Sequence, residues 1–548
     1  MGKQSKLFST VVKAVAVVAS AAMLTSVAGC GSSAHAGEPH GIISADETEP
    51  QYPLVPSNSI ETGGTNVVRE LFEGLVSYDY QGKQHLEAAE SITPNANSTE
   101  YIIKVKHGWT FSNGEPVTAK SFVNAWNFAA NVHNAQLASS NLATIAGYDA
   151  LQDEKVSPTA TMSGLSAPDD YTIDVKMTQP NSVFAVQLAN PAYYPLPSVA
   201  YKDIAKFGEH PIGNGPYVLQ AWHHNQNIML KKNPSYKGER KPKNDGINFK
   251  IYTSMDSAYA DVVGGNLDFL DSVPQAEMFS FKSDPAVKAY SEPGAQFNSF
   301  VIPERLEHFG VNKEGDLRRA AISMAINRSL ICEKLYDNTR TPATDFTSPA
   351  VAEYTKSLPG SEVLDYNVAK AKELWAEANK ISPWSGSFKI AYNSDGSNKE
   401  WVDAVTNELK NNLGINASGD PYATFADLRT RITNRTIDTA FRSGWTMDYP
   451  SAEDYMTPLY TIDAADGKGS NDGDYKNPEF DATLDKALST TDEAQRKEYF
   501  DQAQEILFRD LPAIPLWYSN ITAVSMKDID GVHFDFSNTA TYETMYKK

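Results

Sequence analysis

Short stretches in which apolar and polar residues alternate are separated by longer stretches with a helical period along most of the chain. Alternation typical of half-buried strands occurs in residues 101–107, 171–177, 228–231 and 247–252. Apolar residues three and four positions apart predict helices that begin at Thr118 and at Asp316, the latter with apolar positions as far as Leu335, and others over residues 366–378, 400–413 and 492–508. Strands that alternate with helices throughout predict an α/β fold.

The first strongly apolar run covers residues 11–24 and lies between lysines and a group of small residues. A charged start, a short apolar stretch and a small-residue end are the parts of a secretory signal. The run contains Lys13 and Ser20 and is shorter than the roughly 20 residues that cross a bilayer, so a permanent transmembrane helix is not expected. N-myristoylation is not expected either, because Lys6 stands where that motif has Ser or Thr.

Cys30 directly follows Ala28 and Gly29 and resembles the lipobox cysteine of bacterial lipoproteins. The resemblance implies that residues 1–29 are a signal peptide, that Cys30 receives a diacylglyceryl group, and that its new amine receives an acyl group such as palmitate. The protein would then be anchored in the cell membrane at its extracytoplasmic face, because two or more acyl chains hold a protein stably. Residues 30–48 begin with small and polar side chains and are predicted to be a flexible tether.

Acidic residues outnumber basic ones, with 68 Asp and Glu against 48 Lys and Arg and a formal net charge of −20. This balance argues against a nucleic-acid partner, since phosphate binding needs a basic face. The chain has two cysteines. With Cys30 lipidated, Cys332 stays alone, which excludes an intramolecular disulfide and a zinc site built from two or more cysteines. Cys332 lies on an apolar helical pattern and is predicted to be a buried thiol.

The sequence contains no G-x-S-x-G, H-E-x-x-H, P-loop or EF-hand motif. Gly213 and Gly215 are followed by Val218 where a dinucleotide-binding loop has its third glycine, so they are predicted to form a turn before a strand. His223 and His224 are adjacent, and adjacent strand residues point to opposite faces, so they are not expected to share a metal. We therefore expect a binding protein with no catalytic residue, no cofactor and no metal; an extracytoplasmic hydrolase is the rival from another class.

Six segments, in order along the chain, resemble the large solute-binding proteins of oligopeptide and dipeptide ABC importers. They are residues 69–79, 107–119, 211–217, 317–328, 444–450 and 511–518. The second reads His-Gly-Trp-Thr-Phe-Ser-Asn-Gly-Glu-Pro-Val-Thr-Ala and looks like the signature of that family, which leads into a helix. Together the segments span the chain that follows the predicted signal.

The resemblance implies an α/β fold of the two-lobed, periplasmic-binding-protein-like kind (type II) with an extra inserted domain. Lobe one would combine residues 49–80, 205–295 and 517–548, the inserted domain would cover 81–204, and lobe two would cover 296–516. A protein of this family captures a peptide between its closing lobes and delivers it to the permease subunits of an ABC importer. We expect this chain to do so as a monomer, with no chemistry performed on the ligand.

A free peptide carries an ammonium and a carboxylate, and burying either one without an opposite charge is costly. The stretch from Arg442 to Asp448 supplies both charges within seven residues. In relatives the aspartate of this Trp-x-x-Asp-Tyr segment pairs with the amino terminus of the peptide, which implies that role for Asp448. The resemblance implies that Arg442 receives the carboxyl end of short peptides. Two structural alternatives stay open: Asp448 caps the turn before Pro450, or Arg442 forms an ordinary ion pair.

The resemblance also implies contacts from the backbone and from aromatic side chains in the same segment. Backbone groups of Gly444 and Thr446 would bond the main chain of the ligand as an added strand does. Trp445 and Tyr449 would line pockets for the side chains of the ligand. Both aromatic residues are also candidates for the hydrophobic core.

Thr62 and Asn66 lie just before the first family segment, where relatives place a cleft loop, and are candidate contacts as well. The class of ligand stays open at this point. The alternative to a peptide is another solute in the same fold: an oligosaccharide, which needs aromatic platforms, or a nickel complex, which needs convergent histidines or a chelator. A sensor or adhesin that uses the same cleft without transport is a further alternative.

Overall fold

A computed structural model describes residues 41–394, 398–423, 425–467 and 469–548 of the chain. The predicted signal peptide, Cys30 and the first part of the predicted tether lie outside the described residues. Within the described part, every helix is too short or too polar to cross a membrane.

The largest element is an 11-stranded mixed sheet with the order β15-β14-β16-β12-β17-β11-β1-β10-β9-β8, with β13 beside β17. Its strands are β1 (Ile42–Glu47), β8 (Tyr217–His223), β9 (Asn227–Lys232), β10 (Gly246–Ile251), β11 (Phe269–Leu270), β12 (Lys288–Val301), β13 (Arg340–Pro342), β14 (Ser387–Asn393), β15 (Asn416–Tyr422), β16 (Ala440–Trp445) and β17 (Ala513–Ser525). The predicted strands at 228–231 and 247–252 are confirmed as β9 and β10.

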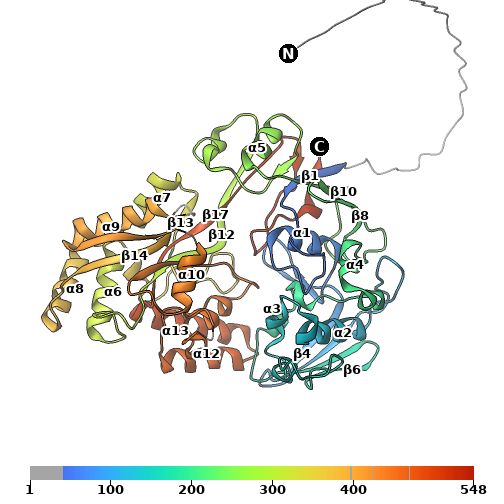
Figure 1. Cartoon of the computed structure of the whole chain (residues 1–548), viewed down its shortest axis with the longest axis horizontal. Helices are drawn as coiled ribbons and strands as arrows, with labels where there is room; N and C mark the ends of the chain where they lie inside the picture. The colour runs from blue at the N-terminus through green and yellow to red at the C-terminus, as the bar shows by residue number, and fades with distance from the viewer. Residues whose placement is uncertain (1–40, 395–397, 424, 468) are drawn as a thin grey trace, which may run out of the picture. The chain divides into compact units, whose positions relative to one another are not determined.

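Two long strands, β12 and β17, join the two halves of this sheet. They pair antiparallel from Lys288 opposite Ser525 to Val301 opposite Ala513, and Figure 1 shows them side by side in green and red. The pairing shifts register between Pro293 and Phe297, which marks a bulge that bends and twists the pair.

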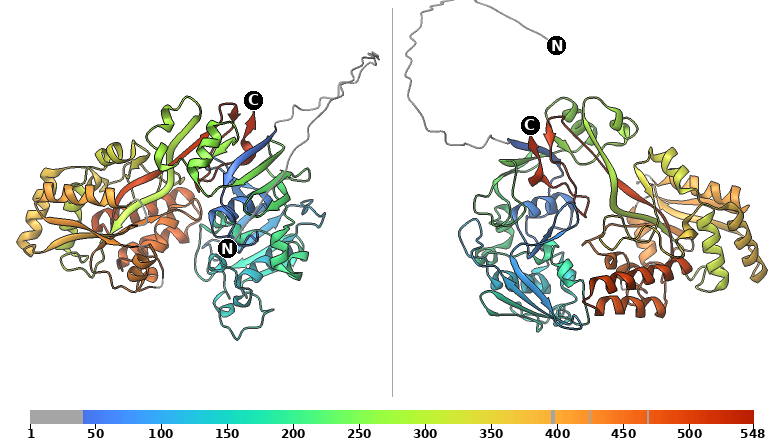
Figure 2. Two further views of the ribbon diagram at one scale, coloured as in Figure 1. Left: turned by 45° about the horizontal axis from the view of Figure 1, so that its top comes forward. Right: turned by 180° about the vertical axis from the view of Figure 1, so that it is seen from behind.

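Smaller sheets and helices complete the fold. The smaller sheets contain β4 (Ala89–Pro94), β5 (Glu100–Val105), β7 (Thr172–Lys176) and β6 (Leu165–Asp169) in that order, then the pairs β2 (Val76–Tyr78) with β3 (Gln84–Leu86) and β18 (Ile529–Asp530) with β19 (Tyr546–Lys547). The helices are α1 (Thr62–Leu71), α2 (Ala119–Ala130), α3 (Phe184–Gln187), α4 (Ile204–Glu209), α5 (Met255–Val263), α6 (Lys313–Met324), α7 (Arg328–Tyr336), α8 (Val368–Ile381), α9 (Lys399–Leu413), α10 (Phe425–Thr433), α11 (Thr457–Tyr460), α12 (Pro478–Ser489) and α13 (Glu493–Asp510). Figure 2 shows α12 and α13 packed along each other.

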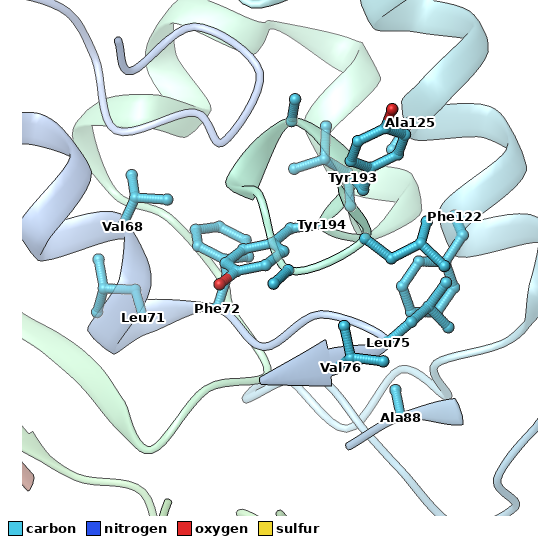
Figure 3. Packing of buried hydrophobic residues seen from close by; sticks show 14 of the residues in the cluster. Val68, Leu71, Phe72, Leu75, Val76, Ala88, Phe122, Ala125, Tyr193 and Tyr194 are labelled. Carbon is cyan, nitrogen blue, oxygen red and sulfur yellow. The ribbon is translucent and has the colours of Figure 1, made fainter. Parts of the chain in front are cut away.

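The paired strands β12 and β17 connect two large hydrophobic cores. In the first, α1 and the segment after it pack against α2 and against Tyr193 and Tyr194, as Figure 3 shows. The second core surrounds the C-terminal half of β12. Strand β17 contributes Ala523 to the first core and Leu516 to the second, so it passes through both.

The tether prediction is wrong for residues 42–47, because they form β1. This strand pairs in parallel with β10, from Ile42 opposite Gly246 to Glu47 opposite Ile251. Ile43 and Ala45 are fully buried. The partner strand lies some 200 positions away in the sequence, so local composition carried no sign of the pairing.

Several helix predictions are confirmed and one is wrong. Thr118 caps α2 through a capping box with Ser121, and the helix predicted over residues 492–508 is α13, which is capped by Asp492. The single helix expected from Asp316 to Leu335 is instead two. Helix α6 is capped by Asn312, whose side chain accepts from the backbone N–H of residues 314 and 315, and α7 starts anew after Asn327. Cys332, in α7, is 1% exposed and is the predicted buried thiol.

The turn predicted at residues 213–215 is confirmed, and it packs directly on the end of α1. The N–H of Gly215 donates to the carbonyl of Leu71 (2.9 Å), and the N–H of Ser112 donates to the carbonyl of Gly213 (2.8 Å). A Cβ atom on Gly213 would lie 1.8 Å from the carbonyl oxygen of Leu71. The position therefore requires glycine because two stretches of backbone meet there.

Replacing Gly213 with Ala is expected to lower the free energy of unfolding by about 1–3 kcal/mol or more, because the backbone at Leu71 must move. Urea unfolding followed by tryptophan fluorescence measures this change. The matched control is Gly264→Ala at the C-terminal end of α5, where φ is −78° and the nearest atom to the new Cβ lies 3.1 Å away. Equal stabilities for the two variants would contradict the packing argument.

Candidate functional site

The segment that carries most of the predicted contacts begins in β16 and continues as a loop after it. Strand β16 pairs with β12, where Gly444 lies opposite Asn298 and Trp445 lies opposite Phe297. On its other side β14 pairs only with Ala440 and Phe441. Among the described strands, the last residues of β16 therefore have a ladder partner on one side alone, which leaves an edge that an extended ligand could join.

Asp454 holds the loop after β16 in place. Its Oδ2 atom accepts from the backbone N–H of Asp448 (2.7 Å) and from Nε1 of Trp445 (3.1 Å). Asp454 is 3% exposed, and its burial, together with the charge of Asp448, raises its pKa well above the usual range. One buried carboxyl thus orients both the aromatic residue and the aspartate predicted to bind the ligand.

Asp448 lies on the exposed side of this loop. The residue as a whole is exposed to solvent. The surrounding protein nevertheless desolvates the carboxyl group, which raises the pKa of Asp448. Gly444 and Thr446 are also exposed, so three alternate residues of this segment face solvent.

Tyr449 connects the loop to α3. Its hydroxyl donates to Oε2 of Glu453 and accepts from Nε2 of Gln187 (3.1 Å). Glu453 is 5% exposed, and burial raises its pKa. The contact brings residues of the predicted inserted domain next to the predicted binding segment.

A cavity of about 460 Å³ opens beside these residues. It is lined by Ser140, Asn141, Thr144, Gln187, Tyr193, Trp445, Asp448, Tyr449, Glu453, Asp454, Thr457, Pro458, Thr461, Asp463, Ala464 and Gly469. The described lining contains four carboxylates and neither Lys, Arg nor His. Such a cavity is suited to a cation.

Arg442 is placed apart from this cavity and does not line it. Its Nε donates to Oδ1 of Asn393 (2.9 Å), and its guanidinium lies 4.9 Å from the ring centroid of Phe425. Because Arg442 and Gly444 are two residues apart in β16, the side chain of Arg442 lies on the face of the strand to which the Cα atom of Gly444 also belongs.

The two early candidates do not line the cavity either. Thr62 is the exposed first residue of α1. Asn66 is buried, and its Nδ2 donates to Oε2 of Glu47 (2.9 Å). Burial and the nearby Asp271 raise the pKa of Glu47 to about 8. In this arrangement Asn66 fastens α1 to β1.

The histidine pair has separate partners. His223 shares a hydrogen bond with Asn227 (2.9 Å), and His224 lies between Glu49 (2.7 Å) and Glu209 (3.1 Å). In the described ranges no group of three or more His, Cys, Asp or Glu residues has the arrangement of a metal site.

Sequence reasoning missed Glu453, Asp454 and Asp463. Glu453 and Asp454 were a usable signal, because these two adjacent carboxylates come three and four residues after Pro450, at the end of the predicted binding segment. Gln187 and Tyr193 gave no signal, since only the tertiary structure brings them to the loop.

Comparisons with known proteins agree on the fold. The sequence profile described as "Bacterial extracellular solute-binding proteins, family 5 Middle" matches residues 83–467. The periplasmic oligopeptide-binding protein OppA of Escherichia coli (strain K12) is 28% identical over 475 residues, which cover 83% of this chain and 82% of that protein. The oligopeptide-binding protein OppA of Bacillus subtilis (strain 168) is 24% identical over 520 residues, 92% of each chain.

Solved structures extend the likeness to three dimensions. MppA, a periplasmic murein tripeptide binding protein in an unliganded open form, has a TM-score of 0.81 at 22% identity, with 93% of this chain and 98% of that chain covered. A complex of Haemophilus influenzae OppA with the peptide RPPGFSPFR has a TM-score of 0.68 at 22% identity and covers 93% and 99%. The predicted fold is therefore confirmed: α/β, two-lobed and periplasmic-binding-protein-like (type II), with an inserted domain.

Replacing Asp454 with Asn is expected to change how stability depends on pH. A carboxyl whose pKa is raised in the folded state binds a proton more tightly there than in the unfolded chain. Its contribution to stability is therefore present at low pH and is lost as pH rises from the ordinary range of an aspartate towards the raised value. Between those limits the wild type should lose stability with rising pH relative to Asp454→Asn.

Urea unfolding at a series of pH values measures the difference between the two proteins. The control is Asp485→Asn at an exposed position of α12. If the difference between wild type and Asp454→Asn stays constant with pH, the account of the buried carboxyl is wrong.

Proposed function

Because the chain belongs to family 5 of the bacterial extracellular solute-binding proteins, we propose that it is an extracytoplasmic receptor that captures peptides between two closing lobes and delivers them to an ABC importer. Two relatives, the OppA proteins of Escherichia coli and Bacillus subtilis, are oligopeptide-binding proteins. The ligand leaves chemically unchanged, and the closed form is what the permease subunits recognise. The receptor acts as a monomer.

The single observation that carries the proposal is the position of Asp448 at the end of an open strand edge. A peptide that adds to the edge of β16 bonds the backbone at Gly444 and Thr446. Its ammonium then reaches the carboxylate of Asp448, where a charge-assisted hydrogen bond compensates for the lost water. Backbone bonding serves any peptide, so the side chains of the ligand are free to vary.

The remaining candidates take supporting roles in this proposal. Trp445 and Tyr449 form walls of the pocket for the first side chain of the ligand, since both line the cavity. Arg442, oriented by Asn393, receives the carboxyl end of short peptides. Thr62 contacts the ligand from the start of α1, and Asn66 acts through its bond to Glu47 by holding that helix.

We propose domain boundaries that are supported by the distribution of the two hydrophobic cores along the chain. Lobe one combines residues 49–80, 205–295 and 517–548, now with β1 added; the inserted domain covers 81–204 and lobe two covers 296–516. The second core, which lies mostly within residues 295–518, supports the limits of lobe two. The first core continues from lobe one into the inserted domain, which supports a rigid connection between those two.

We also propose that Cys30 is lipidated and anchors the receptor to the cell membrane. Its position directly after Ala28 and Gly29, in the sequence of a secretory signal, supports this. A receptor held near its permease has a raised effective concentration there.

The Asp448→Asn variant tests the site. Loss of one partner of a desolvated, hydrogen-bonded charge pair costs about 2–5 kcal/mol, so the affinity for free peptides should fall by roughly 30-fold or more. Titration calorimetry with free and N-acetylated forms of the same peptides measures this. The wild type should discriminate between the two forms and Asp448→Asn should not.

Asp485→Asn is the matched control and should discriminate as the wild type does. Unchanged affinity of Asp448→Asn for free peptides would contradict the role of Asp448. Heat from an oligosaccharide or a nickel complex, with none from any peptide, would contradict the proposed ligand class.

The Cys30→Ser variant tests the anchor. It should leave peptide affinity unchanged and move the protein from the membrane fraction to the soluble fraction, with a fall in peptide uptake by cells. Cell fractionation and uptake of a labelled peptide measure both effects. A Cys30→Ser protein that stays in the membrane fraction would show that the anchor lies elsewhere.

A further inference from the structure

The cavity beside Asp448 contains more carboxyl groups than one peptide amino terminus can pair with. Asp448, Glu453, Asp454 and Asp463 all line it. Throughout the described part of the chain, none of the four forms an ion pair with Lys, Arg or His. An ammonium at Asp448 leaves the other three without a cation.

Two of these carboxyls are deeply buried, so their charge is costly. Glu453 is 5% exposed and Asp454 is 3% exposed. Their hydrogen bonds, to the Tyr449 hydroxyl and to N–H groups of the loop, satisfy oxygen atoms but supply no positive charge. Burial raises the pKa of both. A buried carboxylate is stabilised far more when a cation accompanies it.

The same chain provides that cation elsewhere. Arg240 lies 3.0 Å from Glu70, 3.1 Å from Glu543 and 3.6 Å from Glu73, which places a guanidinium among three buried carboxylates. Glu453 and Asp454 have comparable burial and no such side chain in their described surroundings. A cationic ligand is able to take the position that no described side chain fills.

The cavity has the size and the walls for a long cationic side chain. Its volume of about 460 Å³ is much larger than an ammonium group needs. Trp445, Tyr449 and Tyr193 line it, and aromatic faces attract cations. The Oγ1 atom of Thr144, a lining residue, is buried and has no hydrogen-bond partner among the described residues.

We propose that this cavity selects peptides whose first residue is basic, with the ammonium of the peptide at Asp448 and the lysine or arginine side chain directed towards Glu453 and Asp463. This inference rests on the proposed function, because it assigns the first side chain of the peptide to the cavity next to the amine partner. Glu453 is the buried partner and Asp463 the exposed one at the rim.

The proposed selection depends on the charge of the first side chain of the peptide, which can be varied while its length stays nearly the same. Norleucine has nearly the length of lysine but no charge, so it fills the same space and leaves Glu453 without a cation. A first residue of glutamate adds a like charge to the cluster and is disfavoured. A lysine-first peptide should bind about tenfold or more tightly than its norleucine-first counterpart, and the glutamate-first peptide should bind most weakly.

Competition calorimetry on the purified protein tests this with tripeptides to pentapeptides of alanine that begin with lysine, norleucine or glutamate. In the wild type the lysine-to-norleucine affinity ratio should be about ten or more. The Glu453→Gln and Asp463→Asn variants should each lower the ratio, and the double variant should bring it close to one. Glu498→Gln, at an exposed position of α13 outside the cavity, should keep the ratio of the wild type.

The outcomes separate this inference from the proposed function. Equal affinities of the wild type for lysine-first and norleucine-first peptides, with binding that still depends on Asp448, would overturn the selection alone. A ratio that persists in the double variant would overturn the assignment to this cavity. A protein that binds none of the free peptides would contradict the selection and the proposed function together. Asp463 is exposed, so its variant keeps the test valid if Glu453→Gln does not fold.

Discussion

The pairing of β12 with β17 positions everything else in the large sheet. These strands, of 14 and 13 residues, are the long partners between which the two hydrophobic cores are divided. Strand β16, which carries the candidate site, meets β12 through Phe297 and Asn298, directly after the register shift that begins at Pro293. The bend in the β12–β17 pair is thus next to the edge of β16 that a ligand is proposed to join. A change of angle at the bulge would move β16 relative to the first core, which is the motion that a closing receptor requires.

Buried charge is treated in two different ways in this chain. Around Arg240 the protein supplies the cation for its own buried carboxylates, and the result joins α1, residues 205–295 and residues 517–548 of the predicted lobe one. Around Asp454 the described residues supply hydrogen bonds only, and the carboxyls line a cavity. The second arrangement is costly in the absence of a ligand and is relieved by a bound cation, so binding energy is concentrated at one end of the ligand. That asymmetry suits a receptor that has to recognise the amino terminus of a peptide and tolerate variation further along.

Much of the fold could be read from the sequence, because it depends on local periodicity and on ordered family segments. The capping of α2 by Thr118 and the turn at Gly213 were visible as local chemistry. One failure comes from a long-range contact and the other from a local helix cap. Strand β1 was mistaken for tether because its partner β10 lies far away in the chain, and the break between α6 and α7 was missed because Asn327 interrupts an apolar pattern that continues on both sides. For the site, sequence reasoning selected the loop with Asp448. It did not find Asp454, which orients that loop, and it placed Asn66 with the ligand although that side chain bonds Glu47.

The central claim is that the carboxylate of Asp448 receives the amino terminus of a bound peptide at the end of β16. A crystal structure of the protein with a bound lysine-first peptide tests this most directly. The account predicts the peptide nitrogen within about 2.7–3.2 Å of the Asp448 carboxylate, with the peptide main chain hydrogen-bonded at Gly444 and Thr446. A peptide bound with its amino terminus away from Asp448, or bound without main-chain hydrogen bonds to β16, would contradict it.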